Sequence, residues 1–139
     1  MNKKLVVVIV CFVIAIAFIT IGAKVVSTQS QHNAARKMSD QFVSETLAGK
    51  YDKTYALLTT DAQKSLDTAN WADKLATMHI YFAGRKPTFA SVSWTGTPTF
   101  TYDVAGNDGS YKFVVILNPF KGSGGWRVQS FTSSLAALK

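Results

Sequence analysis

Asp103 and His79 are the two side chains in this sequence that could transfer a proton during catalysis. Such a base needs a second group nearby, for example a tyrosine hydroxyl, that stabilises the oxyanion formed on the substrate. Asp103 alternates with threonines in a strand-like run, which predicts a solvated position. His79 lies at the edge of an apolar helix face, where a histidine is usually a hydrogen-bonded structural residue. We therefore expect no catalytic residue and a protein that is not an enzyme.

No metal or cofactor site is predicted. His32 and His79 are far apart in the chain, and the single cysteine, Cys11, lies within an apolar run, so no ligand spacing is recognisable. The glycine-rich residues 122–125 lead into a predicted strand rather than a helix, which argues against a phosphate-binding loop.

Aromatic side chains suggest a different site, an apolar pocket for a small ligand. In a domain of this size such side chains more often form the core, so both interpretations stay open. The candidate ligand-binding residues are Trp71, Tyr81, Trp94, Tyr102 and Tyr111.

The charge balance does not indicate nucleic-acid binding. The chain has 15 Lys and Arg against 8 Asp and Glu, a net charge of +7. Three lysines flank the N-terminal apolar segment, which leaves about +4 on the remainder, a mild excess typical of a soluble surface. The basic pairs at residues 36–37 and 85–86 are too isolated to form a basic stripe, so we expect no nucleic-acid partner.

Residues 5–23 form an uncharged apolar run that predicts a membrane-spanning helix. Its length as a helix is about 28 Å, close to the hydrocarbon thickness of a bilayer. Lys3 and Lys4 precede it and Lys24 alone follows closely, so the positive-inside rule places the N-terminus in the cytoplasm. A signal peptide cleaved after Ala17 or Ala23 is the alternative. We expect a single-pass protein of the cell membrane with its C-terminal domain outside the cytoplasm.

The chain divides into the anchor, residues 1–26, a polar tether, residues 27–33, and one domain, residues 34–139. The polar residues 27–33 also suit the first turns of a helix that leaves the membrane. The domain opens with a helix whose apolar residues fall on one face, and Gly49 follows at the position of a left-handed C-terminal residue. Short helices are expected over residues 51–58 and 60–66, the latter opened by a capping box at Thr60, and a longer one over residues 70–82 that ends at Gly84. The stripe of the first helix comprises Ala35, Met38, Phe42, Val43 and Leu47.

Strands replace helices after Arg85, because β-branched and aromatic residues alternate with short turn sequences. The predicted strands are residues 88–94, 99–105, 110–118 and 125–132. Short connections join antiparallel neighbours, which predicts a four-stranded meander. The fold class is therefore α+β, with an N-terminal transmembrane helix followed by helices packed on a curved antiparallel sheet.

Three segments together resemble the nuclear transport factor two-like superfamily of cystatin-like or cone-like folds, which includes ketosteroid isomerases and polyketide cyclases. These segments are the opening helix, residues 47–58 (LAGKYDKTYALL), and the hairpin that pairs residues 113–117 with residues 125–131. The resemblance implies a curved sheet around a long helix, often with a cavity at the open end. It also implies a dimer or a component of a larger envelope assembly, as many bacterial members of this kind are, while many others lack catalytic activity.

Two functional hypotheses follow. The first is a membrane-anchored extracytoplasmic interaction or scaffold domain, a component of an envelope, secretion or conjugation assembly, with a protein partner or a second copy of itself. Tethering supports this role because it raises the effective concentration of the domain near membrane partners. The alternative is a small-ligand-binding protein or isomerase-like enzyme that uses the cone cavity.

Overall fold

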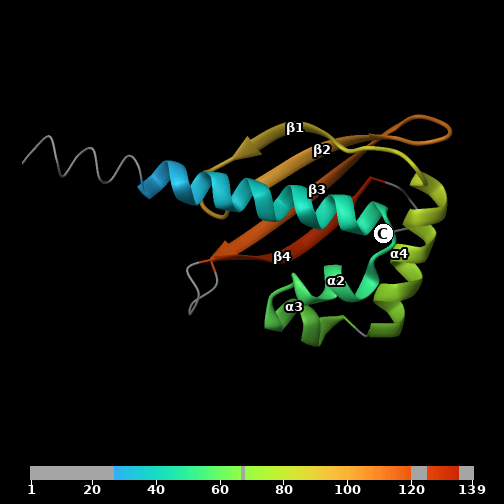
Figure 1. The fold of residues 1–139 in the computed structure, drawn as a ribbon, viewed down its shortest axis with the longest axis horizontal. Helices are drawn as coiled ribbons and strands as arrows, with labels where there is room; N and C mark the ends of the chain where they lie inside the picture. The colour runs from blue at the N-terminus through green and yellow to red at the C-terminus, as the bar shows by residue number, and fades with distance from the viewer. Residues whose placement is uncertain (1–26, 67, 120–124, 135–139) are drawn as a thin grey trace, which may run out of the picture. The chain divides into compact units, whose positions relative to one another are not determined.

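The computed structural model describes residues 27–66, 68–119 and 125–134. Residues Ala34–Lys139 form one compact unit, in which helices come first and a four-stranded sheet follows (Figure 1). The α+β class and the order of elements predicted from the sequence are confirmed. Among the described residues, no helix is both long and apolar enough to cross a membrane. The apolar run of residues 5–23 lies outside them, and the anchor and its orientation stay predictions.

The first helix extends over residues 27–47, and residues 27–33 form its first turns. Its apolar stripe is buried except at Met38, which is partly buried, and Phe42 and Val43 are fully enclosed. Gly49, which has a φ of +69°, follows the end of the helix. Gly49 N–H donates to the Thr46 carbonyl oxygen and Lys50 N–H donates to that of Glu45. This pair of hydrogen bonds is the glycine-dependent Schellman motif.

Three further helices follow: α2 (Tyr51–Ala56), α3 (Thr60–Ser65) and α4 (Thr68–Phe82). The N-cap of α3 is Thr59, whose side chain accepts a hydrogen bond from Ala62 N–H. The capping box predicted at Thr60 is therefore wrong by one residue, because Thr60 already has helical hydrogen bonding. α4 begins two residues before the expected Asn70, and Gly84, with a φ of +72°, follows its end as predicted.

The sheet contains β1 (Thr88–Ser93), β2 (Thr99–Ala105), β3 (Ser110–Pro119) and β4 (Trp126–Ser133). The order is β1-β2-β3-β4 and every neighbouring pair is antiparallel, so the predicted meander is confirmed. Burial alternates along β2 and β3, as expected for strands with one face on the core. In β4 the pairing shifts, since Ile116 pairs with Ser130 whereas Leu117 pairs with Val128, which leaves Gln129 as an extra, bulged residue.

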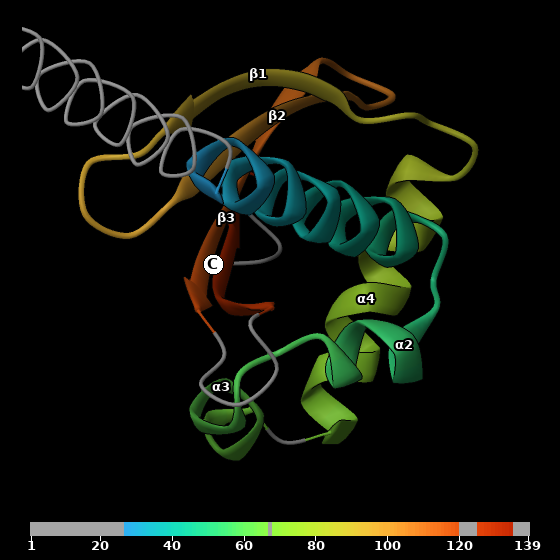
Figure 2. The same cartoon turned by 60° about the vertical axis from the view of Figure 1, so that its left-hand side comes forward.

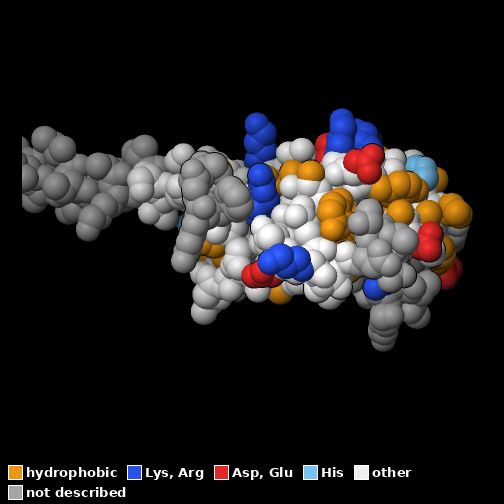
Figure 3. Space-filling view, turned by 90° about the horizontal axis from the view of Figure 1, so that it is seen from below, with side chains coloured by type: hydrophobic (Ala, Val, Ile, Leu, Met, Phe, Trp, Pro, Cys, Tyr) orange, Lys and Arg blue, Asp and Glu red, His pale blue; other side chains and the backbone are white. Residues whose placement is uncertain are grey.

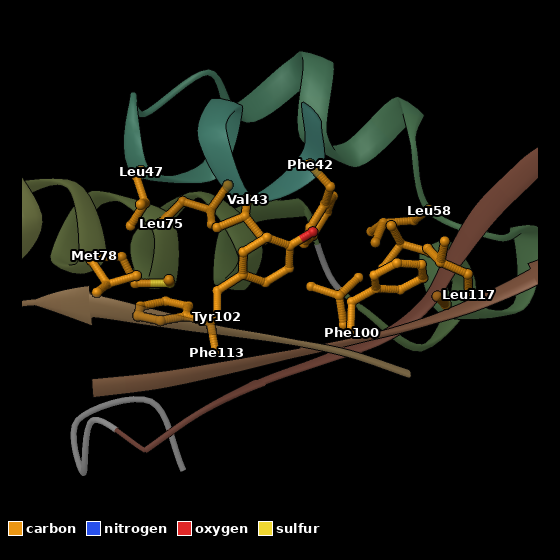
Figure 4. Close-up of a cluster of buried hydrophobic side chains, with 14 of the residues drawn as sticks. Phe42, Val43, Leu47, Leu58, Leu75, Met78, Phe100, Tyr102, Phe113 and Leu117 are labelled. Atoms are coloured by element: carbon orange, nitrogen blue, oxygen red, sulfur yellow. The ribbon is translucent and has the colours of Figure 1, made fainter. Parts of the chain in front are cut away.

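The core lies between the sheet and the helices that cover one of its faces (Figure 2). Figure 4 shows Tyr102 rising from β2 toward the first helix, with Val43 and Phe42 close by. Phe42, on the first helix, packs against both α4 and β4. Its ring centre lies 6.1 Å from that of Trp71 on α4 and 5.5 Å from that of Phe131 on β4. Trp126, at the start of β4, is only half-buried.

Candidate functional site

A cavity of about 200 Å³ lies between α3, α4 and β4. On the face seen in Figure 3, hydrophobic side chains gather on the side where α4 lies, among scattered charged groups. The cavity walls are mostly apolar, with polar side chains from α3, α4 and β4. The lining residues are Leu58, Ala62, Ser65, Leu66, Trp71, Lys74, Leu75, Met78, Gln129, Ser130, Phe131 and Ser133.

Two backbone hydrogen bonds hold α3 at the edge of the sheet and so fix one wall of the cavity. Thr59 N–H donates to the Val128 carbonyl oxygen at 2.8 Å, and Val128 N–H donates to that of Leu57 at 2.9 Å. These bonds form a parallel bridge on the free edge of β4. Tyr55 and Gln63 then join α2 to α3, since each side chain donates to the backbone carbonyl of the other. The wall is therefore set by hydrogen bonds as well as by packing.

Trp71 forms a second wall and is held in one orientation. Its indole Nε1–H donates to Thr54 Oγ1 at 3.3 Å, and Thr54 in turn donates to the Tyr51 carbonyl oxygen at 2.9 Å. Only 5% of Trp71 is exposed. A buried indole that keeps its hydrogen bond gives a rigid apolar surface.

The chemistry available in the cavity is binding rather than proton transfer. Among the described lining residues, Lys74 is the one ionisable side chain, and the other polar groups are serines and Gln129. A lysine ammonium and neutral donors can stabilise an anion, whereas a general base with a pKa near neutrality is missing from this set.

Tyr102, one of the predicted ligand-binding residues, lies in the core and not in the cavity. Its hydroxyl donates to Asp40 Oδ1 at 2.7 Å and is hydrogen-bonded to Ser39 Oγ at 2.9 Å. Arg36 holds the same carboxylate with Nε at 2.8 Å from Oδ1, and its guanidinium carbon lies 3.5 Å from the centre of the Phe89 ring. Burial raises the pKa of Tyr102 above its ordinary value of 10.0, and the Asp40 carboxylate raises it further.

We expect the Tyr102→Phe variant to lose less stability than the native protein as the pH rises into the alkaline range. A tyrosine whose pKa is higher in the folded than in the unfolded protein stabilises the fold fully below about pH 10, and this stability is lost as the pH rises above that value. The phenylalanine variant lacks this loss, although it lowers stability by about 1 to 2 kcal/mol at neutral pH because a hydrogen-bonded hydroxyl is removed. Urea unfolding from about pH 8 to pH 11 measures both effects. If the free energy of unfolding of the two proteins fell equally with rising pH above about pH 10, the raised pKa of Tyr102 would be contradicted.

Tyr81 and Tyr111, two further candidates, are brought together, but outside the cavity. Both hydroxyls donate to Asp108 Oδ1 in the β2–β3 turn, Tyr111 at 2.6 Å, and the two oxygens lie 2.8 Å apart. These hydrogen bonds raise the pKa of Tyr81 and lower that of Asp108. Gly106 is required here, because a Cβ atom at this position would lie 2.7 Å from Tyr111 Cε2. The cluster fastens the turn to the end of α4.

Trp94, Asp103 and His79 each make a packing contact, an ion pair or a hydrogen bond within the domain. Trp94 is half-buried and packs edge-on against Phe100 with ring centres 5.5 Å apart. Asp103 forms an ion pair with Lys112 at 2.9 Å on the exposed side of the sheet. His79 Nδ1 lies 2.8 Å from the Leu47 carbonyl oxygen, and since a carbonyl can only accept, this nitrogen carries the proton. His79 thus bonds a carbonyl in the last turn of the first helix.

Trp71 is the one predicted ligand-binding residue that lines the cavity. Leu75 and Met78 were not proposed as site residues, although they share a helix face with Trp71 at spacings of four and seven, which is a detectable signal. Gln129 and Phe131 also line the cavity, next to the bulge in β4. The sequence contains no signal that predicts this bulge.

Comparison of the sequence with protein-family models and with curated proteins gives no match.

Proposed function

We propose that residues 34–139 form a non-catalytic interaction domain held outside the cytoplasm by an N-terminal membrane anchor. The observation that carries this proposal is the placement of the ionisable groups. Asp103 is engaged by Lys112 on the surface, and His79 is engaged by a helix carbonyl. Neither lines the cavity, where catalysis of the isomerase type would require a base.

The membrane part of the proposal rests on the sequence of residues 5–23 and the lysines around it. A span of this length partitions strongly into a bilayer, and Lys3 and Lys4 favour a cytoplasmic N-terminus. The proposed location is the cell membrane, with the domain on the extracytoplasmic side. Residues 27–33 are helical and polar, so the chain emerging from the span would continue as a helix.

The proposed partner is another envelope protein or a second copy of the chain. A long helix against a four-stranded antiparallel sheet is consistent with membership of the nuclear transport factor two-like superfamily. Domains resembling this one recur as components of secretion and conjugation assemblies, and we propose such a role as the concrete form of the interaction function. The alternative of small-ligand binding has one observation in its favour, the apolar cavity between α3, α4 and β4.

Release of the domain from the membrane tests the proposal. Replacing residues 5–23 with a cleavable signal should leave the fold intact, yet it should abolish most of the ability of the gene to complement its own deletion. The reason is that a detached domain loses its effective concentration near membrane partners, a factor of about 10² or more. Fractionation with a carbonate wash checks that the native chain stays with membranes and that the altered chain does not.

The anchored Asp103→Asn variant is the matched control. It should complement fully, because Asp103 makes only a surface ion pair worth about 1 kcal/mol or less. Loss of a catalytic carboxylate would instead remove a factor of about 10² to 10⁴ in rate. A severe defect in this variant at unchanged stability, together with full activity of the released domain, would replace the interaction function with catalysis.

A further inference from the structure

The cavity between α3, α4 and β4 has no part in the proposed anchoring, and its composition indicates a ligand. We propose that it binds a small monocarboxylic acid with an apolar body, about the size of phenylacetate. The proposal concerns the cavity alone and does not depend on what the domain contacts at the membrane.

The apolar walls define the body of the ligand. Trp71, Leu75 and Met78 line the cavity from α4, and Phe131 lines it from β4. The volume of about 200 Å³ is somewhat larger than cavities of about 150 Å³ that admit benzene. One aromatic ring or a short alkyl chain therefore fits, with room left for one polar group.

Lys74 defines the charge of the ligand. It is exposed, lines the cavity, and makes no ion pair with any of the described residues. Ser130 adds a neutral hydrogen-bond donor to the lining, whereas the Ser65 hydroxyl already donates to the Ala62 carbonyl oxygen at 3.0 Å. Among the described lining residues, a single cation with a neutral donor matches one negative charge, and a carboxylate can accept from both groups.

An acidic group in a neighbouring hollow supports the same orientation of the ligand. Asp61 lines a separate, more open hollow that shares Ala62, Ser65 and Gln129 with the cavity. Its carboxylate would repel an anion at that end, whereas Lys74 attracts one from α4. The carboxylate of the ligand is therefore placed on the Lys74 side and its apolar body against the aromatic walls.

The walls are already fixed without a ligand, which lowers the cost of binding. Trp71 is held by its hydrogen bond to Thr54, and Phe131 is held by stacking on Phe113 with ring centres 5.5 Å apart. A preformed cavity of this size is expected to bind a ligand of about ten non-hydrogen atoms with a dissociation constant of about 0.1 to 1 mM.

The test is a titration of the full-length chain, reconstituted in lipid nanodiscs, with phenylacetate, followed by the indole N–H signals of its tryptophans in nuclear magnetic resonance spectra. The Trp71 signal should shift to saturation, because this ring lines the cavity. The Trp94 signal should stay in place, because that ring packs against Phe100 away from the cavity. Phenylacetamide, the neutral analogue, should bind about tenfold more weakly, as should phenylacetate to the Lys74→Met variant.

Lys53→Met is the matched control, because Lys53 is an exposed lysine on α2 that does not line the cavity, and its affinity for phenylacetate should equal that of the native chain. Three results would each overturn the proposal. They are the absence of a saturable shift of the Trp71 signal up to the solubility limit, equal affinity for phenylacetate and phenylacetamide, and undiminished binding of phenylacetate by a folded Lys74→Met variant.

Discussion

Replacing Phe42 with alanine is expected to lower the free energy of unfolding by about 3 to 5 kcal/mol. Phe42 is fully buried in the first helix, and its ring contacts both Trp71 of α4 and Phe131 of β4. Truncation would leave a void among three elements that cannot all move inward, because Trp71 is tied to Thr54 by a hydrogen bond. Urea unfolding of the full-length protein, followed by circular dichroism, measures the change.

Ile80→Ala is the matched control for the loss of a large apolar side chain. Ile80 is 78% exposed on α4, so its truncation should change stability by no more than about 0.5 kcal/mol. Trp126→Ala should fall between the two, because Trp126 is half-buried and not enclosed. Equal losses for Phe42→Ala and Ile80→Ala would show that the first helix does not organise the core.

The elements of the fold follow from local rules, and this is why the sequence predicts them well. Phe100, Tyr102 and Val104 alternate with polar residues, and this period of two is enough to place a strand with one buried face. The spacing of Phe42, Val43 and Leu47 likewise defines a helix face, and Gly49 marks its end. Each rule depends only on residues that are close together in the chain, and none depends on which residues pack opposite them in the core.

Positions that depend on distant partners could not be predicted in the same way. The strand pattern counts Trp126 as apolar, but whether it is enclosed depends on what covers the edge of the sheet beside it. Thr59 and Thr60 are equally suited to cap α3, and the choice falls on Thr59, whose N–H also donates to Val128 on β4. The hydrogen bond between Thr59 and the distant Val128 thus favours Thr59 over Thr60 as the N-cap of α3.

The candidate site shows the same limit more strongly. Aromatic residue type led to five candidates, yet only Trp71 lines the cavity. Tyr102 is directed to the first helix by Ser39 and Asp40, while Tyr81 and Tyr111 are directed to the β2–β3 turn by Asp108. The hydroxyl groups of these tyrosines have hydrogen-bond partners far from the cavity lining, and residue type alone does not reveal them. Lys74, the residue on which our ligand proposal depends most, has no sequence signal that separates it from other surface lysines.

Gly49→Ala is expected to be more destabilising than its counterpart Gly84→Ala, although both glycines follow a helix and have nearly the same backbone geometry. Their φ angles are +69° and +72°, so each alanine costs about 1 to 2 kcal/mol for left-handed backbone. At Gly84 a Cβ atom would meet nothing within 4 Å, whereas at Gly49 it would lie 3.0 Å from His79 Cγ. The imidazole cannot retreat freely, because its Nδ1–H is bonded to the Leu47 carbonyl oxygen.

The difference between the two variants therefore isolates the contact with His79, and we expect it to be about 1 kcal/mol or more, as for other overpacked sites. Urea unfolding of both single variants, and of Gly49→Ala combined with His79→Ala, measures it as a double-mutant cycle. In the His79→Ala background the additional cost at Gly49 should disappear, while the cost of the left-handed backbone should remain. If Gly49→Ala and Gly84→Ala were equally destabilising, His79 would be free to move, and its bond to the first helix would not hold α4 in place.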